Sequence, residues 1–393
     1  MAKKIYTGID IGTYHVKVVI CAPGETTETP AAPMHIIGTG TASSKGMRHG
    51  YIIDVNEATK SVREALHRAQ VAAKQRVRHA RVGVGGVGLD EIRSSGAVSL
   101  TAFGGIVTDA AIERAKSESQ KQASSRLVNR KVIHVIPLEY RIDGQPVLGQ
   151  PVGLQGTKLT VNTLVITMLS QHYDDLIQAV ESSGVEVDDV MASPLAASLV
   201  TLTKAQKMAG VVLANIGAET LSIVVFDNDV PVSVKVFPTG SADVTNSIAL
   251  SFQVPLPEAE QLKRGAVTGS DIPSRKMDSL VSTKLKEMFT LVNAHLKSIG
   301  RQRLLPAGVV ITGGGSGLTS ASEVARAVMK LPSQTGQIGL LARASTVDAT
   351  WAVAAGLCRW AYAEDMSGRT SSLAEILGGG WDSVKKGIRS LLP

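Results

Sequence analysis

The stretch Tyr6-Thr-Gly-Ile-Asp-Ile-Gly-Thr-Tyr-His-Val-Lys-Val-Val-Ile20 has a weak counterpart in Val211-Val-Leu-Ala-Asn-Ile-Gly-Ala-Glu-Thr-Leu-Ser-Ile-Val-Val225. Both place β-branched residues on each side of a glycine turn, which is typical of a hairpin rather than of the start of a helix. Asp10 and Asn215 hold equivalent positions, so the copies lie 205 residues apart (215 minus 10). This repeat predicts two similar halves that face one another.

The composition is that of a folded protein of several domains. The chain has 393 residues, 44% of them hydrophobic, which is enough for two to four units with their own cores. Its two cysteines, Cys21 and Cys358, are far apart in sequence and share no metal-type spacing with histidine, which suits a reducing cytoplasm. No apolar run approaches the roughly 20 residues that cross a bilayer, and the first residues lack a signal-peptide core.

The surplus of positive charge narrows the possible partners. A formal charge of +7 and a pI near 9.3 would suit nucleic acid, but only 4% of the residues are aromatic. No basic run is interleaved with stacking side chains, so nucleic acid is not an expected partner. An anionic membrane or an acidic peptide would satisfy the same charge.

Periodicity divides the rest of the chain into helices and strands. Spacings of three and four predict helices over Asn56–Ala73 and Asp174–Ser183. Between about 84 and 161 the rhythm changes, which predicts an inserted small α+β domain. Its expected elements are a polar helix over Thr108–Ser124 and strands around Ile133–Tyr140 and Leu159–Thr167.

The last third of the chain continues the alternation of predicted helices and strands up to about Ala363 and then loses it. A lysine-rich helix is expected over Ser279–Ile299, followed by the buried strand Gly308–Thr312 and the loop Gly313–Gly317. The next helix should begin at Thr319 or Ser320, because both residues cap well. Core patterning stops at Ala363, and a Ser-, Gly- and Arg-rich linker begins at Ser367.

The glycine turns indicate a site for phosphates. A phosphate tail held between two halves needs backbone N–H groups that point inward from both sides, and glycine lets the backbone approach closely. Asp10 is suited to order a hydrated Mg²⁺, Thr13 to donate its hydroxyl and Lys17 to place a positive charge near the phosphates. Three consecutive glycines, Gly313 to Gly315, would let a third loop pass under a flat base or ribose. Either hairpin alone would more simply be an ordinary turn in a mixed sheet, but the two together with the third loop favour a phosphate site.

Other chemical motifs are weak. Gly83-Val-Gly-Gly-Val-Gly88 matches the dinucleotide fingerprint, but the helix that should follow it is interrupted by Gly96. His15 and His134 are interpreted as packed or surface residues, and no Ser/His/Asp group or carboxylate pair is present in the pattern. No residue stands out as catalytic, and Asp10 and Asn215 lie nearest the expected position for hydrolysis.

Four short segments resemble one family in particular: Ser44-Lys-Gly-Met47, Val132-Ile-His-Val-Ile-Pro-Leu-Glu-Tyr140, Pro151-Val-Gly-Leu154 and Ala259-Glu-Gln-Leu-Lys263. In this order they look like the FtsA family of bacterial cell-division proteins, within the actin/Hsp70/hexokinase superfamily. The resemblance covers roughly residues 4 to 363 and the terminal helix. It implies an α/β, actin-like (ribonuclease H-like) duplicated fold with an inserted α+β subdomain and a C-terminal amphipathic helix.

The resemblance also implies a division into subdomains. The expected units are subdomain 1A (1–83 and 163–198), the inserted subdomain 1C (84–162), subdomain 2A (199–241 and 301–366), subdomain 2B (242–300), a flexible linker (367–380) and a membrane-targeting helix (381–393).

The nucleotide site that the family implies is built from the two hairpins, a short helix and the third glycine loop, with ATP and Mg²⁺ as ligands. Residues matching Glu260 and Lys263 lie beside the adenosine in the family. One departure bears on hydrolysis, because the family usually has Asp where this chain has Asn215, and Asn carries no charge to polarise a nucleophile. Weak or absent ATP hydrolysis is therefore expected. The candidate binding residues are Asp10, Gly12, Thr13, Tyr14, Lys17, Asn215, Gly217, Ala218, Glu219, Thr220, Glu260, Lys263, Gly313, Gly314, Gly315 and Ser316.

The partners implied by the family are the C-terminal tail of the tubulin-like protein FtsZ, further copies of the chain in a polymer, and later division proteins. Lys284, Lys286 and Lys297 are interpreted as a basic face for the acidic tail, although charge runs often only face water. The family commonly has Arg at the position of Lys284. The expected location is the cytoplasmic face of the cell membrane at the division site.

The last residues predict a helix that lies on a membrane. At about 100° per residue, one arc holds the apolar residues Trp381, Val384, Ile388, Leu391 and Leu392, and Lys385 and Arg389 border it. Such a stripe suits anionic lipids. The alternative is a helix packed on the protein's own core, which the Gly378–Gly380 hinge disfavours.

Two other functions are alternatives to cell division. A small-molecule kinase of the same superfamily would need a catalytic Asp near an acceptor pocket, which the sequence does not offer. The actin-like inner-membrane platform protein of type IV pilus assembly shares the inserted subdomain. It lacks a terminal amphipathic helix and the Pro151–Leu154 signature.

Overall fold

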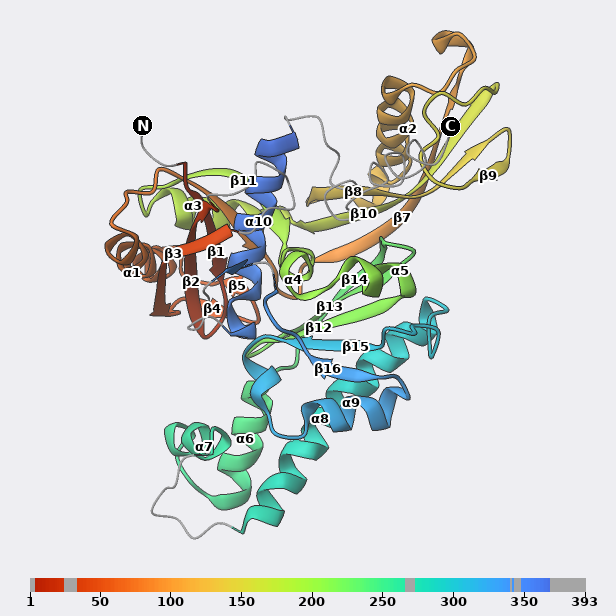
Figure 1. The fold of residues 1–393 in the computed structure, drawn as a ribbon. Coiled ribbons are helices and arrows are strands. Elements are labelled where there is room, and N and C mark those ends of the chain that lie inside the picture. The colour runs from red at the N-terminus through yellow and green to blue at the C-terminus, as the bar shows by residue number, and fades with distance from the viewer. Residues whose placement is uncertain (1–3, 25–33, 266–272, 340, 343–347, 368–393) are drawn as a thin grey trace.

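The computed structural model describes residues 4–24, 34–265, 273–339, 341–342 and 348–367 (Figure 1). Two sheets form the body, and a smaller sheet projects from it. Within these ranges no helix is long and apolar enough to cross a bilayer. The predicted helix at 381–393, and all of the predicted linker except Ser367, lie outside the described residues.

The first sheet contains the first hairpin at its centre. β2 runs antiparallel to β1 and β3, which flank it, whereas β6 lies parallel to β1, β11 parallel to β6 and β17 parallel to β3. The spatial order is β11 (Glu186–Ala192), β6 (His79–Val84), β1 (Tyr6–Ile11), β2 (His15–Pro23), β3 (Met34–Ser43) and β17 (Leu341–Ala342). A short ribbon of β4 (Met47–Arg48) and β5 (Tyr51–Ile52) adjoins this sheet.

The second sheet repeats this connectivity. Its first three strands form an antiparallel meander, and its last two strands lie parallel to the first of them. The spatial order is β14 (Val230–Phe237), β13 (Leu221–Asp227), β12 (Val211–Ile216), β15 (Val309–Thr312) and β16 (Ser333–Thr335). The repeated topology confirms the duplicated fold that the two hairpin sequences predict.

The inserted domain is an antiparallel sheet with one helix on its face (Figure 1). Its spatial order is β7 (Asp90–Ser99), β10 (Lys158–Leu169), β8 (Arg130–Ile142) and β9 (Gln145–Val147). Helix α2 (Asp109–Gln122) begins where expected, because the Thr108 hydroxyl accepts a hydrogen bond from the Ala111 amide at 3.2 Å. The short 3₁₀ turns η1 (Thr101–Phe103) and η2 (Ser124–Arg126) complete the domain.

Two helices cover one side of the first sheet. α1 (Val55–Ala73) begins at the Asp54 cap, whose carboxylate accepts from the Glu57 amide at 3.1 Å. It lies so close to β3 that a Cβ atom on Gly40 would overlap the Ala65 carbonyl oxygen. α3 (Ser170–Glu181) directly follows β10 and begins four residues before the predicted Asp174. The sequence pattern missed this first turn because it is polar and carries no apolar period.

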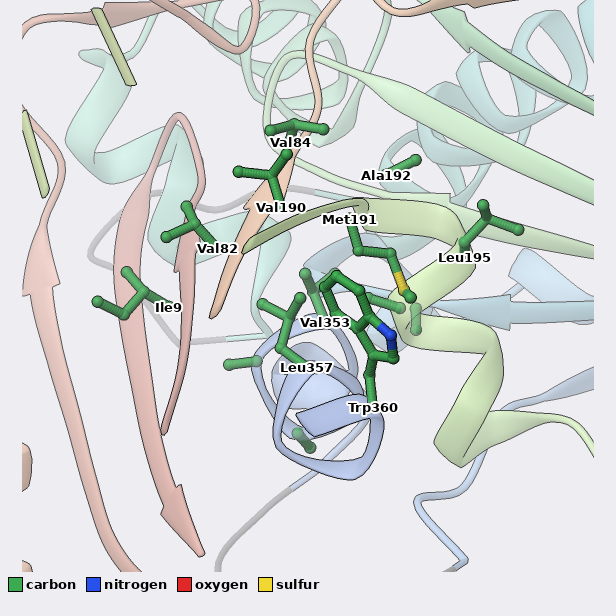
Figure 2. Packing of buried hydrophobic residues seen from close by; sticks show 14 of the residues in the cluster. Ile9, Val82, Val84, Val190, Met191, Ala192, Leu195, Val353, Leu357 and Trp360 are labelled. Carbon is green, nitrogen blue, oxygen red and sulfur yellow. The ribbon is translucent and has the colours of Figure 1, made fainter. Parts of the chain in front are cut away.

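Helix α10 (Ala352–Ser367) comes last in the described chain but packs on the first sheet. Figure 2 shows Val353, Leu357 and Trp360 turned toward strand residues that include Ile9 and Val82. A Cβ atom on Gly8 would overlap the backbone of α10 at Ala354. The predicted boundary that places 301–366 with the second half is therefore wrong for α10, although the other subdomain limits stay predictions. α4 (Ser193–Thr201) lies between α10 and the second sheet, and α5 (Lys204–Ala209) follows it.

The remaining helices gather beyond the second sheet (Figure 1). They are α6 (Ser241–Phe252), α7 (Leu256–Lys263), α8 (Ser274–Ser298) and α9 (Ala321–Met329). Ser320 precedes α9 as predicted, but its side chain makes no capping bond and its hydroxyl lies 3.3 Å from that of Ser282. The predicted capping at this helix is wrong, since Ser320 does not have the extended backbone that a cap requires.

Candidate nucleotide-binding cleft

The two hairpin turns have the same local geometry. In the first, the Gly12 amide donates to the His15 carbonyl at 3.1 Å, and in the second the Gly217 amide donates to Thr220 at 2.8 Å. A Cβ atom on either glycine would lie 3.0 Å from that same carbonyl oxygen. The equivalence of Gly12 and Gly217, inferred from a weak sequence repeat, is therefore present in the structure.

Asp10 and Lys17 face each other across the first hairpin. They are register partners on β1 and β2. Burial raises the pKa of Asp10 to about 6, although Lys17 lowers it. Burial also lowers the pKa of Lys17, and the carboxylates of Asp10 and Asp348 partly offset this. The Lys17 ammonium donates to the Thr350 carbonyl at 2.6 Å.

The start of α6 supports the second turn from behind. The Ser241 amide donates to the Gly217 carbonyl at 2.9 Å, and the Ala242 amide to the Ala218 carbonyl at 2.7 Å. A Cβ atom on Gly240 would overlap Ala218. Sequence reasoning missed this contact, although Thr239-Gly-Ser-Ala-Asp243 is a recognisable helix start in which the Asp243 carboxylate accepts from the Gly240 amide.

At each of the three consecutive glycines of the third loop, an added side chain would meet a different environment. Gly313 has φ of +83° and faces the Asn215 side-chain oxygen, which a Cβ atom would overlap. A Cβ atom on Gly315 would overlap the Ile216 side chain, whereas one on Gly314 would meet no atom within 4 Å. The expected loop is a 3₁₀ turn, η3 (Gly314–Gly317), and the Ser316 hydroxyl donates to the Gly313 carbonyl at 2.7 Å.

Gly314 faces a cavity of about 460 Å³. Two segments that the sequence reasoning did not select also line it, one starting at the last residue of β16 and the other lying just before α10. The lining residues are Gly314, Ser316, Gly317, Thr335, Gly336, Gln337, Ile338, Asp348, Ala349 and Thr350. A larger hollow of about 760 Å³ lies at α9 and the edge of β16, and none of the candidate residues lines it.

Contacts between the two halves close the cleft around the hairpins. The His49 amide, beside β4, donates to the Glu219 carboxylate at 2.5 Å. The Arg264 guanidinium, which follows α7, lies over the Tyr14 ring at 5.6 Å. In the first half, the Gly50 amide donates to the Thr13 hydroxyl oxygen at 3.1 Å. Thr13, Tyr14 and Glu219 therefore meet at one place in the fold.

Glu260 and Lys263 are near the second turn but are paired with each other at 2.6 Å. The Lys263 ammonium also donates to the Ser241 carbonyl at 3.2 Å, and the Thr245 hydroxyl donates to Glu260 at 2.7 Å. These bonds join α7 to the start of α6 and so to Gly217. Hydrogen bonds from Lys263 and Thr245 hold the pKa of Glu260 below its usual value despite its burial.

The dinucleotide-type motif is structural, as inferred. β6 ends at Val84 and the chain enters strand β7 at Asp90, so no helix follows the glycines. A Cβ atom on Gly86 would instead lie 2.7 Å from the Gly50 carbonyl oxygen. His134 is also a packed residue, because its ring nitrogen accepts from the Ala192 amide at 3.1 Å and burial lowers its pKa to about 3.

The three lysines of α8 do not form one face. At about 100° per residue of α-helix, Lys286 and Lys297 lie about 200° and 220° around the axis from Lys284. Lys284 is half-buried on the opposite flank and pairs with Glu287 at 2.8 Å. The predicted single basic face is therefore wrong, because the buried stripe of α8 separates Lys284 from the other two.

The described residues contain no group of three or more His, Cys, Asp or Glu side chains that would hold a metal directly. Mg²⁺ prefers few protein ligands and keeps several waters when phosphates are present. The half-buried carboxylate of Asp10, whose pKa burial raises, fits a cation held through water. The open space at Gly314 fits a base or ribose.

Comparison with known proteins identifies the fold class first. The fold matches the protein of a PilM–PilN type IV pilus biogenesis complex with a TM-score of 0.67, 17% identity, and coverage of 90% of this chain and 97% of that chain. It also matches MreB5 of Spiroplasma citri bound to ADP, with a TM-score of 0.50, 11% identity and coverage of 96% and 99%. The chain has the actin-like fold.

Sequence similarity then identifies the family. Residues 86–167 match the model described as the SHS2 domain inserted in FtsA, and residues 212–356 match the cell division protein FtsA. FtsA of Pseudomonas aeruginosa is 30% identical over 354 residues, which are 85% of this chain and 83% of the relative. FtsA of Bacillus subtilis is 26% identical over 83% of this chain and 77% of its own length. The chain belongs to the FtsA family of cell-division proteins.

Proposed function

We propose that this division protein binds ATP with Mg²⁺ in the cleft between its two halves, and that the nucleotide holds the halves together. The observation that supports this most is that both hairpins adjoin the cavity of about 460 Å³ that the third glycine turn lines. Gly313 and Gly315 lie against Asn215 and Ile216 of the second hairpin, and Lys17 of the first hairpin bonds to Thr350, which also lines the cavity. Backbone amides of the turn residues that follow Gly12 and Gly217 would receive the phosphates, and Asp10 would hold the hydrated cation. The contacts His49–Glu219 and Arg264–Tyr14 already close the same cleft.

Calorimetry with Mg²⁺–ATP tests the position of the site. Gly314→Leu should abolish binding, because its side chain would fill the cavity. Gly339→Leu is the matched control, since Gly339 also has open space around it, lacks a positive φ and does not line the cavity. Equal affinity in the two variants would remove the cavity from the site.

We further propose that bound ATP is hydrolysed very slowly. Asn215 is the register equivalent of Asp10 in the second hairpin, and it pairs across the strands with Ser222 where Asp10 pairs with Lys17. At these two positions the second hairpin therefore has neither the carboxylate nor the ammonium of the first. Asn215→Asp should raise phosphate release, whereas release by the intact protein faster than about one per second would contradict the proposal.

The partner we propose for α8 is the acidic C-terminal tail of FtsZ. Lys286 and Lys297 are exposed on one side of α8, whereas Lys284 is partly neutralised by Glu287. We expect Lys286→Glu combined with Lys297→Glu to weaken binding of the tail peptide by about tenfold, which is the loss of two exposed ion pairs at ~0.5–1 kcal/mol each. Lys284→Glu, the variant the sequence suggests, serves as the comparison, and a loss confined to it would move the interface to the other flank.

Attachment to the inner membrane is proposed from the sequence of residues 381–393, which lie outside the described residues. The apolar stripe of Trp381, Val384, Ile388, Leu391 and Leu392 would enter the acyl region, and Lys385 and Arg389 would meet anionic headgroups. Polymerisation of the actin-like body would align many such helices and make attachment firm, and the assembly would then recruit later division proteins. A fluorescent fusion should form a ring at midcell, and polar spots would favour a pilus role.

A further inference from the structure

A short turn joins the two halves at the floor of the cleft. This turn, η4 (Ala349–Trp351), follows Asp348, whose carboxylate accepts from the Thr350 amide at 2.9 Å and from its hydroxyl at 2.6 Å. On one side the Lys17 ammonium of the first half donates to the Thr350 carbonyl at 2.6 Å. On the other side the second half holds the Ala349 carbonyl.

Two donors of the second half reach the Ala349 carbonyl. The buried Thr312 hydroxyl donates to it at 2.8 Å, and the Gly313 amide at 3.3 Å. Thr312 ends β15, the strand beside the Asn215 strand, and Gly313 begins the third glycine loop. The two adjacent carbonyls, Ala349 and Thr350, are therefore held by opposite halves of the molecule.

Lys17 is poorly compensated in this position. It is the cation that the first hairpin places beside Asp10, and burial disfavours its charge more than Asp10 and Asp348 favour it. Besides the Thr350 carbonyl, it lies 5.8 Å from the centroid of the Trp351 ring, a weak cation–π contact. A phosphate oxygen accepts a stronger, charge-assisted bond from an ammonium than a neutral carbonyl does.

The turn leads directly into α10. η4 ends at Trp351 and α10 begins at Ala352, and the first turn of α10 carries Val353 and Ala354 onto the first sheet. Any change at the Thr350 carbonyl thus acts at the N-terminal end of the helix that fills the core of the first half (Figure 2).

We propose that Lys17 is a positioning residue that exchanges the Thr350 carbonyl for the phosphates of a bound nucleotide, and so links occupancy of the cleft to the 348–351 turn and the start of α10. This inference rests on the proposed ATP binding. Without nucleotide, Lys17 holds the turn against the first half. With nucleotide, the turn keeps its hydrogen bond from Thr312 but loses the one from Lys17. The backbone amides from 349 to 355 then become less protected from hydrogen exchange.

Hydrogen exchange on the full chain measures this directly. Saturation with Mg²⁺–ATP should speed amide exchange in 349–355 by several-fold, while the hairpin turns become more protected. Trp351 emission should change on binding, and the change should vanish in Trp351→Phe, in which calorimetry should still detect ATP. Binding by calorimetry with unchanged exchange at 349–355 overturns the inference alone, and absence of binding overturns the proposed function with it.

A matched pair of variants tests the hydrogen bond from the Thr312 hydroxyl to the Ala349 carbonyl. Thr312→Val removes the hydroxyl that holds Ala349, whereas Thr312→Ser keeps it. We expect Thr312→Val to show fast exchange at 349–355 even without nucleotide, and Thr312→Ser to behave like the intact chain. Equal protection in the two variants would show that Thr312 does not hold the turn and would overturn the inference, and the exchange of the intact chain tests it if Thr312→Val does not fold.

Discussion

Asp10 is the residue whose ionisation the cleft controls most strongly. Burial raises its pKa to about 6, against ~3.9 for an exposed Asp. The folded protein without ligand therefore holds this proton more tightly than the unfolded chain does. The contribution of Asp10 therefore lowers the free energy of unfolding as the pH rises from about 4 to about 6. A bound cation would stabilise the ionised carboxylate.

Binding of Mg²⁺–ATP should depend on the same ionisation with the opposite sign. If Asp10 must be ionised to hold the hydrated cation, affinity should be up to about tenfold weaker at pH 5 than at pH 7.5, since one pH unit below a pKa leaves about a tenth of the group ionised. Calorimetry at both pH values measures this. Asp10→Asn should bind weakly at both, which separates the effect from titration of ATP itself, and a full pH dependence in that variant would exclude Asp10.

At the scale of elements, α10 is held by glycines that allow backbones to touch. A Cβ atom on Gly356 would overlap the Ala196 carbonyl of α4. Gly356→Ala should lower the free energy of unfolding by about 1–3 kcal/mol, because overpacking outweighs the gain of up to ~1 kcal/mol in helix propensity. Gly317→Ala, in open space, should stay within ~0.5 kcal/mol of the intact chain in urea denaturation, and equal midpoints for the two variants would contradict the close packing.

A second contact between elements joins the inserted domain to the second half. The Glu91 carboxylate of β7 accepts from the Ser233 hydroxyl at 2.9 Å and from the Val234 amide at 2.6 Å, both on β14. The ring nitrogen of His295 lies 2.8 Å from the same hydroxyl. Burial raises the pKa of Glu91, and these bonds lower it in part.

Removal of the Glu91 side chain should loosen the inserted domain. Glu91→Ala leaves the buried Val234 amide without this acceptor, and leaves the Ser233 hydroxyl with the His295 ring nitrogen alone, at a cost of about 1–3 kcal/mol. Limited proteolysis should then cut between β6 and β7 faster than in the intact chain. Glu91→Gln keeps an acceptor oxygen and should lie in between, and a cleavage rate unchanged in both would show that the domain is held elsewhere.

The whole molecule is expected to reach the membrane weakly as a monomer and firmly as a polymer. Five large apolar side chains at roughly 1.5–3 kcal/mol each bound the gross gain near ~10 kcal/mol, from which ordering must be subtracted. Co-sedimentation with anionic vesicles should therefore rise steeply with protein concentration. A chain ending at Gly378 and the variant Trp381→Glu should stay in solution, and pelleting of either as well as the intact protein would exclude the terminal helix as the anchor.

The amino-acid sequence by itself determined the local elements, whose formation depends on residues close together in the chain. The hairpins at Gly12 and Gly217, the helix after Asp54 and the helix after Thr108 follow from turn glycines, caps and periodicity within about fifteen residues. The duplicated fold followed because two such local patterns are alike.

Only the tertiary structure decided which distant segments meet. Cys358, far from Cys21 in sequence, lies against the strand that carries Cys21, where the Cys358 thiol donates to the Val19 carbonyl at 3.2 Å. Lys17 meets Thr350, α10 joins the first sheet, and α8 divides lysines that looked like one face. Such contacts leave no local period, because they depend on which surfaces two distant segments bury together, and that is settled only when the whole chain has packed.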